Sequence, residues 1–159
     1  MSKQAAAIIR KQLKALGITS RQVSVRYRSC TISGAVDVVI KDVTVPIARV
    51  REIAMAHKSV SRCSVSGEIL GGGNTYVDVQ VDRDVLEALA ATVEPELPTD
   101  NTVREVRGLR VHAHPHEHFT YVVDHETWAR PVHVFGREHC AQKVVQWGIE
   151  VRQAEKAVA

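Results

Sequence analysis

Hydrophobic positions in the first half of the chain recur with two different periods, which predict helices and strands in turn. Residues 3–16 place Ile9 and Leu13 one helical repeat apart, so we expect a helix there. Apolar and polar positions alternate over residues 22–28 and again over residues 35–41, which is typical of strands with one buried face. The short loop between these two segments favours an antiparallel hairpin.

A second helix is predicted after Thr44, whose hydroxyl can cap it, with Pro46 in its first turn. Its apolar stripe consists of four positions at helical spacing: Ile47, Val50, Ile53 and Ala54. A short strand over residues 61–66 is expected next, with Cys63 and Val65 pointing inward. The helices and the first two strands together make one αββα unit.

Residues 67–82 predict a β-hairpin with a glycine-rich turn. The sequence GGGN at residues 71–74 supplies backbone positions that tolerate positive φ, so the chain can reverse there. Valines then alternate with polar residues over residues 77–82, as in a strand with one dry face. A further amphipathic helix is expected over residues 83–93.

The stretch EPELPTDN, residues 94–101, contains two prolines and no periodicity, so it is the expected linker. Strand patterns return at residues 109–114 and residues 119–123, a third short strand is expected at residues 132–134, and a helix follows. We therefore predict an α+β fold: an αββα unit followed by a Gly-turn β-hairpin and helix, with a C-terminal β-hairpin and helix as an extension. The expected domains are residues 1–93 and residues 102–159, the latter packed on the same core or forming a separate lobe.

The net charge of +3 conceals a strong asymmetry along the chain. Residues 1–62 carry 12 Lys or Arg and 3 Asp or Glu, whereas residues 63–103 carry 1 and 8. The strongly basic segment 1–62 favours contact with phosphate or with an acidic protein surface. The alternative is that the acidic segment 63–103 folds back on it and neutralises its charge.

Composition and cysteine usage indicate a soluble intracellular protein. No apolar run approaches the roughly 20 residues that a membrane span needs, and charge interrupts the N-terminal segment too early for a signal peptide. The 3 cysteines are far apart and form no CxxC pair, which argues against a disulfide framework. We therefore expect a cytoplasmic protein that does not enter the membrane.

Several segments resemble a known family in their order and spacing: AAAIIRKQLKALGI, VSVRYRS, GAVDVVIKD, the Pro-started helix and SGEILGGGNTYVDV. Over roughly residues 4–82 they resemble the large polyvalent protein-associated domains of phages and conjugative elements, of the type with an IRK-x-LK helix and an SVR strand. The resemblance implies a protein of a mobile genetic element in a bacterial host, where such proteins handle DNA or blunt host defences. It supplies no catalytic motif and does not extend beyond Glu94.

Histidines gather in the second half of the chain, where seven of the eight lie within residues 112–139. His112 and His114 stand two apart on an expected strand, so both imidazoles project to one side. This geometry suits a divalent metal, with His116, His118 or Glu117 of the following turn as the third ligand. The alternative is a polar surface hairpin without metal.

The leading hypothesis is a non-enzymatic protein that binds and inhibits a host nucleic-acid-handling defence complex, of the anti-CRISPR or anti-restriction type. Acidic residues that imitate DNA phosphates would form its binding surface: Asp78, Asp82, Asp84, Glu87, Glu94 and Glu96. An alternative is an accessory protein of DNA transfer that binds DNA or RNA directly through basic residues: Lys3, Arg10, Lys14, Arg26 and Arg28.

A second alternative is a metal-dependent enzyme centred on His112 and His114. Apart from that metal, we expect no cofactor. The sequence leaves open whether the protein forms a homodimer.

Overall fold

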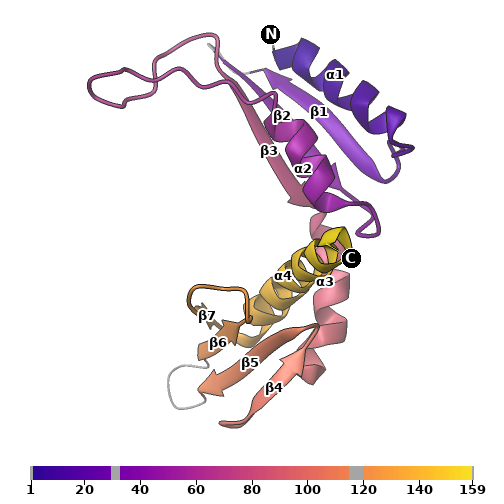
Figure 1. The fold of residues 1–159 in the computed structure, drawn as a ribbon, viewed down its shortest axis with the longest axis vertical. Coiled ribbons are helices and arrows are strands. Elements are labelled where there is room, and N and C mark those ends of the chain that lie inside the picture. Colours follow the sequence, from indigo (N-terminus) through magenta and orange to yellow (C-terminus); the bar gives the residue numbers. More distant parts are fainter. Residues whose placement is uncertain (1, 30–32, 115–119, 159) are drawn as a thin grey trace. The chain divides into compact units, whose positions relative to one another are not determined.

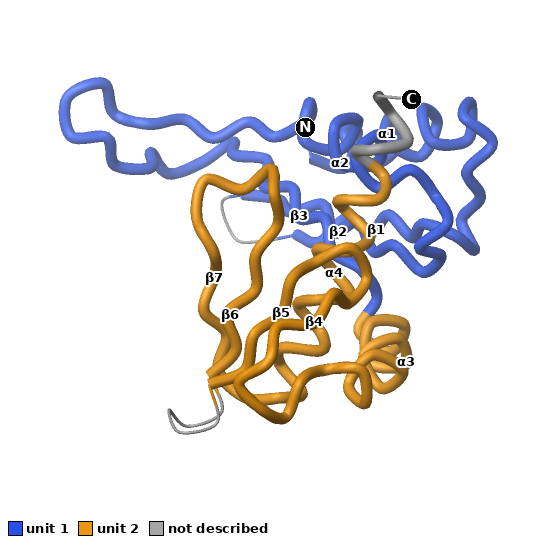
Figure 2. The backbone as a smooth tube through the Cα atoms, turned by 60° about the horizontal axis from the view of Figure 1, so that its bottom comes forward, with its two compact units in different colours: residues 1–82 blue, residues 83–159 orange. Residues whose placement is uncertain are grey.

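The computed structural model describes residues 2–29, 33–114 and 120–158. The chain divides into two compact units, residues 1–82 (unit 1) and residues 83–159 (unit 2), shown in Figure 2. Each unit has its own sheet and its own helices, so the predicted α+β class is confirmed. The boundary falls earlier than the expected linker, which lies inside unit 2.

Unit 1 packs two helices against one face of a sheet. Its described elements are α1 (Ser2–Ala15), β1 (Val23–Ser29), β2 (Gly34–Ile40), α2 (Ile47–Met55) and β3 (Thr75–Val81) (Figure 1). β2 is the central strand, with β1 antiparallel on one side and β3 parallel on the other. The parallel pairing requires α2 and the long segment after it to carry the chain back between β2 and β3.

The apolar periods identified in the sequence explain the core of unit 1. On β2 the side chains of Val36, Val38 and Ile40 are fully buried, while Ile9 and Leu13 of α1 are buried against the sheet. The four predicted stripe positions of α2 are buried as well. The predicted strands, their hairpin and both helices are thus confirmed.

Two local expectations in unit 1 were wrong. The first concerns Thr44, which does not cap α2, since Pro46 is the residue that precedes the helix and no side chain caps it. Thr44 instead donates its hydroxyl and its backbone N–H to Asp42, at 2.6 and 2.9 Å, and these bonds lower the pKa of Asp42. An Asx-type turn therefore holds the loop before the helix.

The second is the predicted Gly-turn hairpin, which was wrong in its pairing. β3 occupies the predicted residues but pairs parallel with β2 over its whole length. The chain reverses earlier, where Arg62 bridges to Ile69, and residues 61–66 form no regular strand. Val65, expected to point inward, is 94% exposed because it lies in that turn.

Unit 2 is an antiparallel meander with helices packed on it. Its described elements are α3 (Arg83–Val93), the 3-10 turn η1 (Glu94–Glu96), β4 (Val103–Val106), β5 (Leu109–His114), β6 (Thr120–Asp124), β7 (Val132–Phe135) and α4 (Arg137–Val158). The strands neighbour one another in chain order. Arg107 and Gly108 both have positive φ and join β4 to β5 as a two-residue hairpin turn. β4 was not expected from the sequence.

The expected linker is a packed part of unit 2. Leu97 is 1% exposed, and the Arg137 guanidinium of α4 donates to the backbone oxygens of Glu94 and Leu97 at 2.6 and 3.2 Å. Pro95, one of the two prolines that suggested a linker, instead lies in the 3-10 turn that follows α3. Among the described residues, no helix is long and apolar enough to cross a membrane.

Candidate functional site

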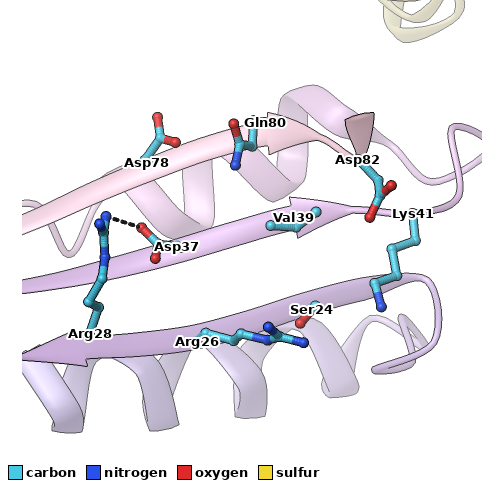
Figure 3. Close-up of a pocket in the computed structure, with 9 residues that line it drawn as sticks. All are labelled: Ser24, Arg26, Arg28, Asp37, Val39, Lys41, Asp78, Gln80 and Asp82. Atoms are coloured by element: carbon cyan, nitrogen blue, oxygen red, sulfur yellow. Dashed lines mark hydrogen bonds and ion pairs between the residues drawn. The ribbon is translucent and has the colours of Figure 1, made fainter. Parts of the chain in front are cut away.

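The sheet of unit 1 carries helices on one face, and its other face is the candidate site (Figure 3). Because side chains alternate along each strand, the polar ones point away from α1 and α2. This open face is formed by nine residues: Ser24, Arg26, Arg28, Asp37, Val39, Lys41, Asp78, Gln80 and Asp82. They line a shallow hollow of about 440 Å³.

Basic and acidic side chains occupy opposite sides of the open face. β1 contributes Arg26 and Arg28, whereas Asp78 of β3 and Asp82 directly after it stand on the far side. The central strand and its end contribute one charge of each sign, from Asp37 and Lys41. The face is therefore nearly neutral in sum, yet it is polarised across the strands.

The strand register places three of these charges in one row. Arg26 lies opposite Asp37 in one ladder, and Asp37 lies opposite Asp78 in the other. Neighbouring strands are about 4.8 Å apart, so the backbones of Arg26 and Asp78 are roughly 10 Å apart, on either side of Asp37. The next row is uncharged and consists of Ser24, Val39 and Gln80.

Only part of this charge is paired within the face. Arg28 Nη2 lies 3.0 Å from Asp37 Oδ1, and the Arg28 side chain is 67% exposed. Such a surface pair contributes about 0–1 kcal/mol to stability. Within the described part of the chain, Arg26 and Asp78 have no ion-pair partner. One cation on β1 and one carboxylate on β3 are thus available to an external charge.

The five basic residues suggested by the sequence do not form one surface. Arg26 and Arg28 lie on the open face. The others belong to α1, which covers the opposite face: Lys3, Arg10 and Lys14. The Arg10 guanidinium donates to the Val25 backbone oxygen at 2.6 and 3.1 Å, and so covers the outer edge of β1. A covered edge resists pairing with further strands, which is a structural role.

The six acidic residues are divided between the two units. Asp78 and Asp82 belong to unit 1, and the other four belong to unit 2: Asp84, Glu87, Glu94 and Glu96. Three of those four form ion pairs inside unit 2, namely Glu87 with Arg83 at 2.6 Å, Glu94 with Arg137 at 3.7 Å and Glu96 with Arg107 at 3.9 Å. Each arginine offsets a carboxylate, so this group presents less negative charge than its sequence indicates.

The predicted histidine pair lies on the outward side of the second sheet. The rings of His112 and His114 are 4.2 Å apart between centroids, and both residues are half-buried. His116, Glu117 and His118 lie outside the described residues, so the predicted third ligand stays a prediction. In the ranges that the structure describes, no group of three or more potential ligands is placed to hold a metal ion. Metal analysis of protein purified without chelator tests the metal hypothesis directly.

The two described cysteines differ in ionisation but neither forms a catalytic pair. Burial raises the pKa of Cys140 to about 12. Hydrogen bonds from the Ser66 hydroxyl and from the backbone of Ser66 and Val65 lower the pKa of Cys63 to about 7. Among the described residues no histidine hydrogen-bonds to either sulfur, so the thiol–imidazole pair of a cysteine enzyme is missing there.

The open face includes residues that were not proposed as site residues from the sequence. The alternation along the second strand already placed Asp37, Val39 and Lys41 on its polar side. It could not show that β3 would lie next to that strand and bring Asp78 into the same row. The missing information was strand pairing, which no period in the sequence encodes.

Comparisons with known proteins add no further constraint. The chain matches no protein-family model, and no curated protein or solved structure matches it significantly. The resemblance to the large polyvalent protein-associated domains therefore stays a prediction from the sequence.

Proposed function

We propose that this protein acts by binding another protein, without catalysis, and that the open face of unit 1 is its binding surface. One observation carries the proposal: a sheet face that neither helix of unit 1 covers presents a basic strand, a central strand with one charge of each sign, and an acidic strand. A protein surface offers both signs of charge at fixed spacing, so it can complement such a face.

The same arrangement disfavours nucleic acid as the ligand of this face. A phosphate bound by Arg26 would lie near Asp37 and within reach of the field of Asp78. With an effective dielectric constant between that of water and that of a protein surface, Asp37 at about 5 Å would oppose a phosphate by roughly 1–3 kcal/mol, and Asp78 at about 10 Å by roughly half as much. Nucleic-acid grooves gather positive charge, whereas the charged row of this face sets two carboxylates beside one cation.

The partner class rests on the resemblance of residues 4–82 to domains of phages and conjugative elements. Proteins in that setting meet restriction and CRISPR complexes, so a host defence complex is the proposed target. The protein would inhibit such a complex by occupying one of its surfaces. This step depends on the resemblance, whereas the assignment of the binding face depends on the geometry alone.

The experiment compares wild-type protein with Arg26→Glu in bacteria that carry defined restriction or CRISPR systems. We expect the wild type to raise the recovery of targeted phage or plasmid, and Arg26→Glu to lose most of that effect. Lys11→Glu is the matched control, because Lys11 is exposed on α1, away from the open face, and the change in net charge is the same.

Two outcomes would count against the proposal. If the wild type changes recovery in none of the defence systems, the proposed target is wrong. If Arg26→Glu and Lys11→Glu behave alike, the open face is not the binding surface. Electrophoretic mobility shift assays with DNA and RNA test the alternative function, direct nucleic-acid binding. Such binding would produce a shift that weakens steeply as the salt concentration rises.

A further inference from the structure

On the open face, one row of side chains reverses its charge across the central strand, from Arg26 on β1 to Asp78 on β3, whereas Arg28 and Asp82 stand in different rows near opposite ends of the strands. β1 carries two arginines on this face, and β3 with its following residue carries two aspartates. Arg26 and Asp78 share one row and stand at equal distance from β2, one strand to each side. A surface in which position and charge reverse together is complementary to a copy of itself turned by half a rotation.

We propose that the open face binds the open face of a second copy of this chain, in a weak homodimer that covers the surface until a partner displaces it. This inference rests on the proposed function, because it assigns the resting occupant of the same surface. The occupant is identified by charge complementarity: each charged side of the face meets the opposite side of the same face.

The symmetry follows from the strand order. Consider two open faces in contact, related by a two-fold axis that runs parallel to β2 and lies between the sheets. The rotation keeps each row in place along the strands and exchanges the two sides, so β1 of one copy lies over β3 of the other. Arg26 then faces Asp78 of the second copy, and the reverse pair forms at the same time.

The distances permit these pairs to form. Sheets that pack face to face lie about 10 Å apart. An arginine and an aspartate that extend toward each other span that gap with one charge-assisted hydrogen bond between them. The hollow of about 440 Å³ in each face leaves room for water between the sheets, as is usual in polar interfaces. Twist of the sheets makes the register approximate rather than strict.

The axis also brings identical residues together, namely Asp37, Val39 and, directly after β2, Lys41, whose exposed ammonium group adds a weak repulsion at one end. Asp37 faces its own copy, but each Asp37 already accepts a hydrogen bond from Arg28 at 3.0 Å. The cation remains beside the carboxylate and offsets the repulsion between the two copies. Val39 also faces its own copy in the neighbouring row, which adds a small apolar contact at the centre.

The size of the face limits the affinity. Three strands of seven residues give a face of roughly 14 by 23 Å, which is small beside the roughly 800 Å² per partner of a standard interface. We therefore expect a dissociation constant of roughly 10–100 μM, which is weak enough for a competing protein to open the dimer. Because the pairs are at the surface, the dimer should weaken as salt concentration rises.

Sedimentation equilibrium of the purified full-length protein tests the proposal with a charge-swap design. Arg26→Glu alone places two acidic pairs across the interface, and Asp78→Arg alone places two basic pairs there. We expect each variant alone to lose at least tenfold in dimer affinity. An equimolar mixture restores opposite charges in both pairs, so the mixture should dimerise as well as the wild type does. That recovery also shows that both variants are folded.

A wild type that stays monomeric up to about 1 mM, above the range expected for so small a face, would overturn the proposal. A dimer whose affinity neither variant changes, or a mixture that stays monomeric while circular dichroism shows both variants folded, would overturn it too. These readouts use the isolated protein, so they fail or succeed independently of the defence assays. A monomeric wild type that still inhibits a defence system would keep the proposed function and remove the dimer.

Discussion

The guanidinium of Arg137 holds the turn after α3 against α4, and replacing it should destabilise unit 2 selectively. Nη2 donates to the Glu94 and Leu97 backbone oxygens at 2.6 and 3.2 Å. Two longer contacts, at 3.4 Å to the Pro98 oxygen and to the Tyr121 hydroxyl, are too weak to count fully. The Arg137→Met substitution keeps the apolar stem and removes every donor.

The expected loss follows from the two shorter hydrogen bonds. Hydrogen bonds that involve a charged group contribute about 1.5–3 kcal/mol each. The Arg137 side chain is 29% exposed, so after the substitution water can donate some of the hydrogen bonds that the guanidinium donated. Leu97, by contrast, is almost fully buried, and its carbonyl group would lose its partner. We expect Arg137→Met to lower the free energy of unfolding by about 2–4 kcal/mol.

Tryptophan fluorescence during urea unfolding measures this loss in unit 2 alone. Both tryptophans of the chain, Trp128 and Trp147, lie in unit 2, where their rings meet edge to face at 5.3 Å between centroids. Arg130→Met is the matched control, because Arg130 is exposed and should change stability by less than about 0.5 kcal/mol. Equal midpoints for Arg137→Met and Arg130→Met would refute the role assigned to the Arg137 hydrogen bonds.

Three further predictions concern thiols and glycines. Because the pKa of Cys63 is lowered to about 7, its alkylation rate should rise as the pH rises through 7 and level off above it. Cys140, with a pKa of about 12, should react only after unfolding; peptide mapping by mass spectrometry separates the two, and equal rates would contradict the assignment. Gly34→Ala should lower the stability of unit 1 by about 1–3 kcal/mol, since the added methyl would overlap Ser2 and lie 2.9 Å from the Tyr27 ring. Gly108→Ala should lower the stability of unit 2 by about 1–2 kcal/mol, because its φ of 82° strains a residue that has a side chain, although the added methyl would meet open space. Calorimetry checks both glycine predictions, and unchanged melting temperatures would refute them.

The elements of unit 1 were predictable because burial imposes a period on the sequence. The three β2 residues with no exposed side chain sit at every second position, and the buried residues of α2 recur at helical spacing. Patterns of this kind depend only on which side of an element faces the core. They can therefore be recognised in the sequence without knowing which elements are neighbours.

The packed turn at residues 94–98 could not be predicted for the opposite reason. Its stability depends on Arg137, about forty positions further along the chain, and on the burial of Leu97. Locally the segment has two prolines and no period, which are features of linkers as well as of turns. The segment is distinguished from a linker only by a distant cation that satisfies its backbone oxygens.

The open face shows most clearly where the sequence stops being informative. A period of two assigns Asp78 to the polar side of β3 under any pairing, but it does not choose the neighbour of that strand. Had residues 77–82 paired in a hairpin with the segment before them, Asp78 would not share a row with Asp37 and Arg26. The parallel pairing with β2 turns an uneven charge distribution along the chain into two charged sides of one face. The proposed binding surface and its proposed self-complementarity therefore both depend on the sheet topology, and a charge swap between Arg26 and Asp78 tests the self-complementarity that this topology implies.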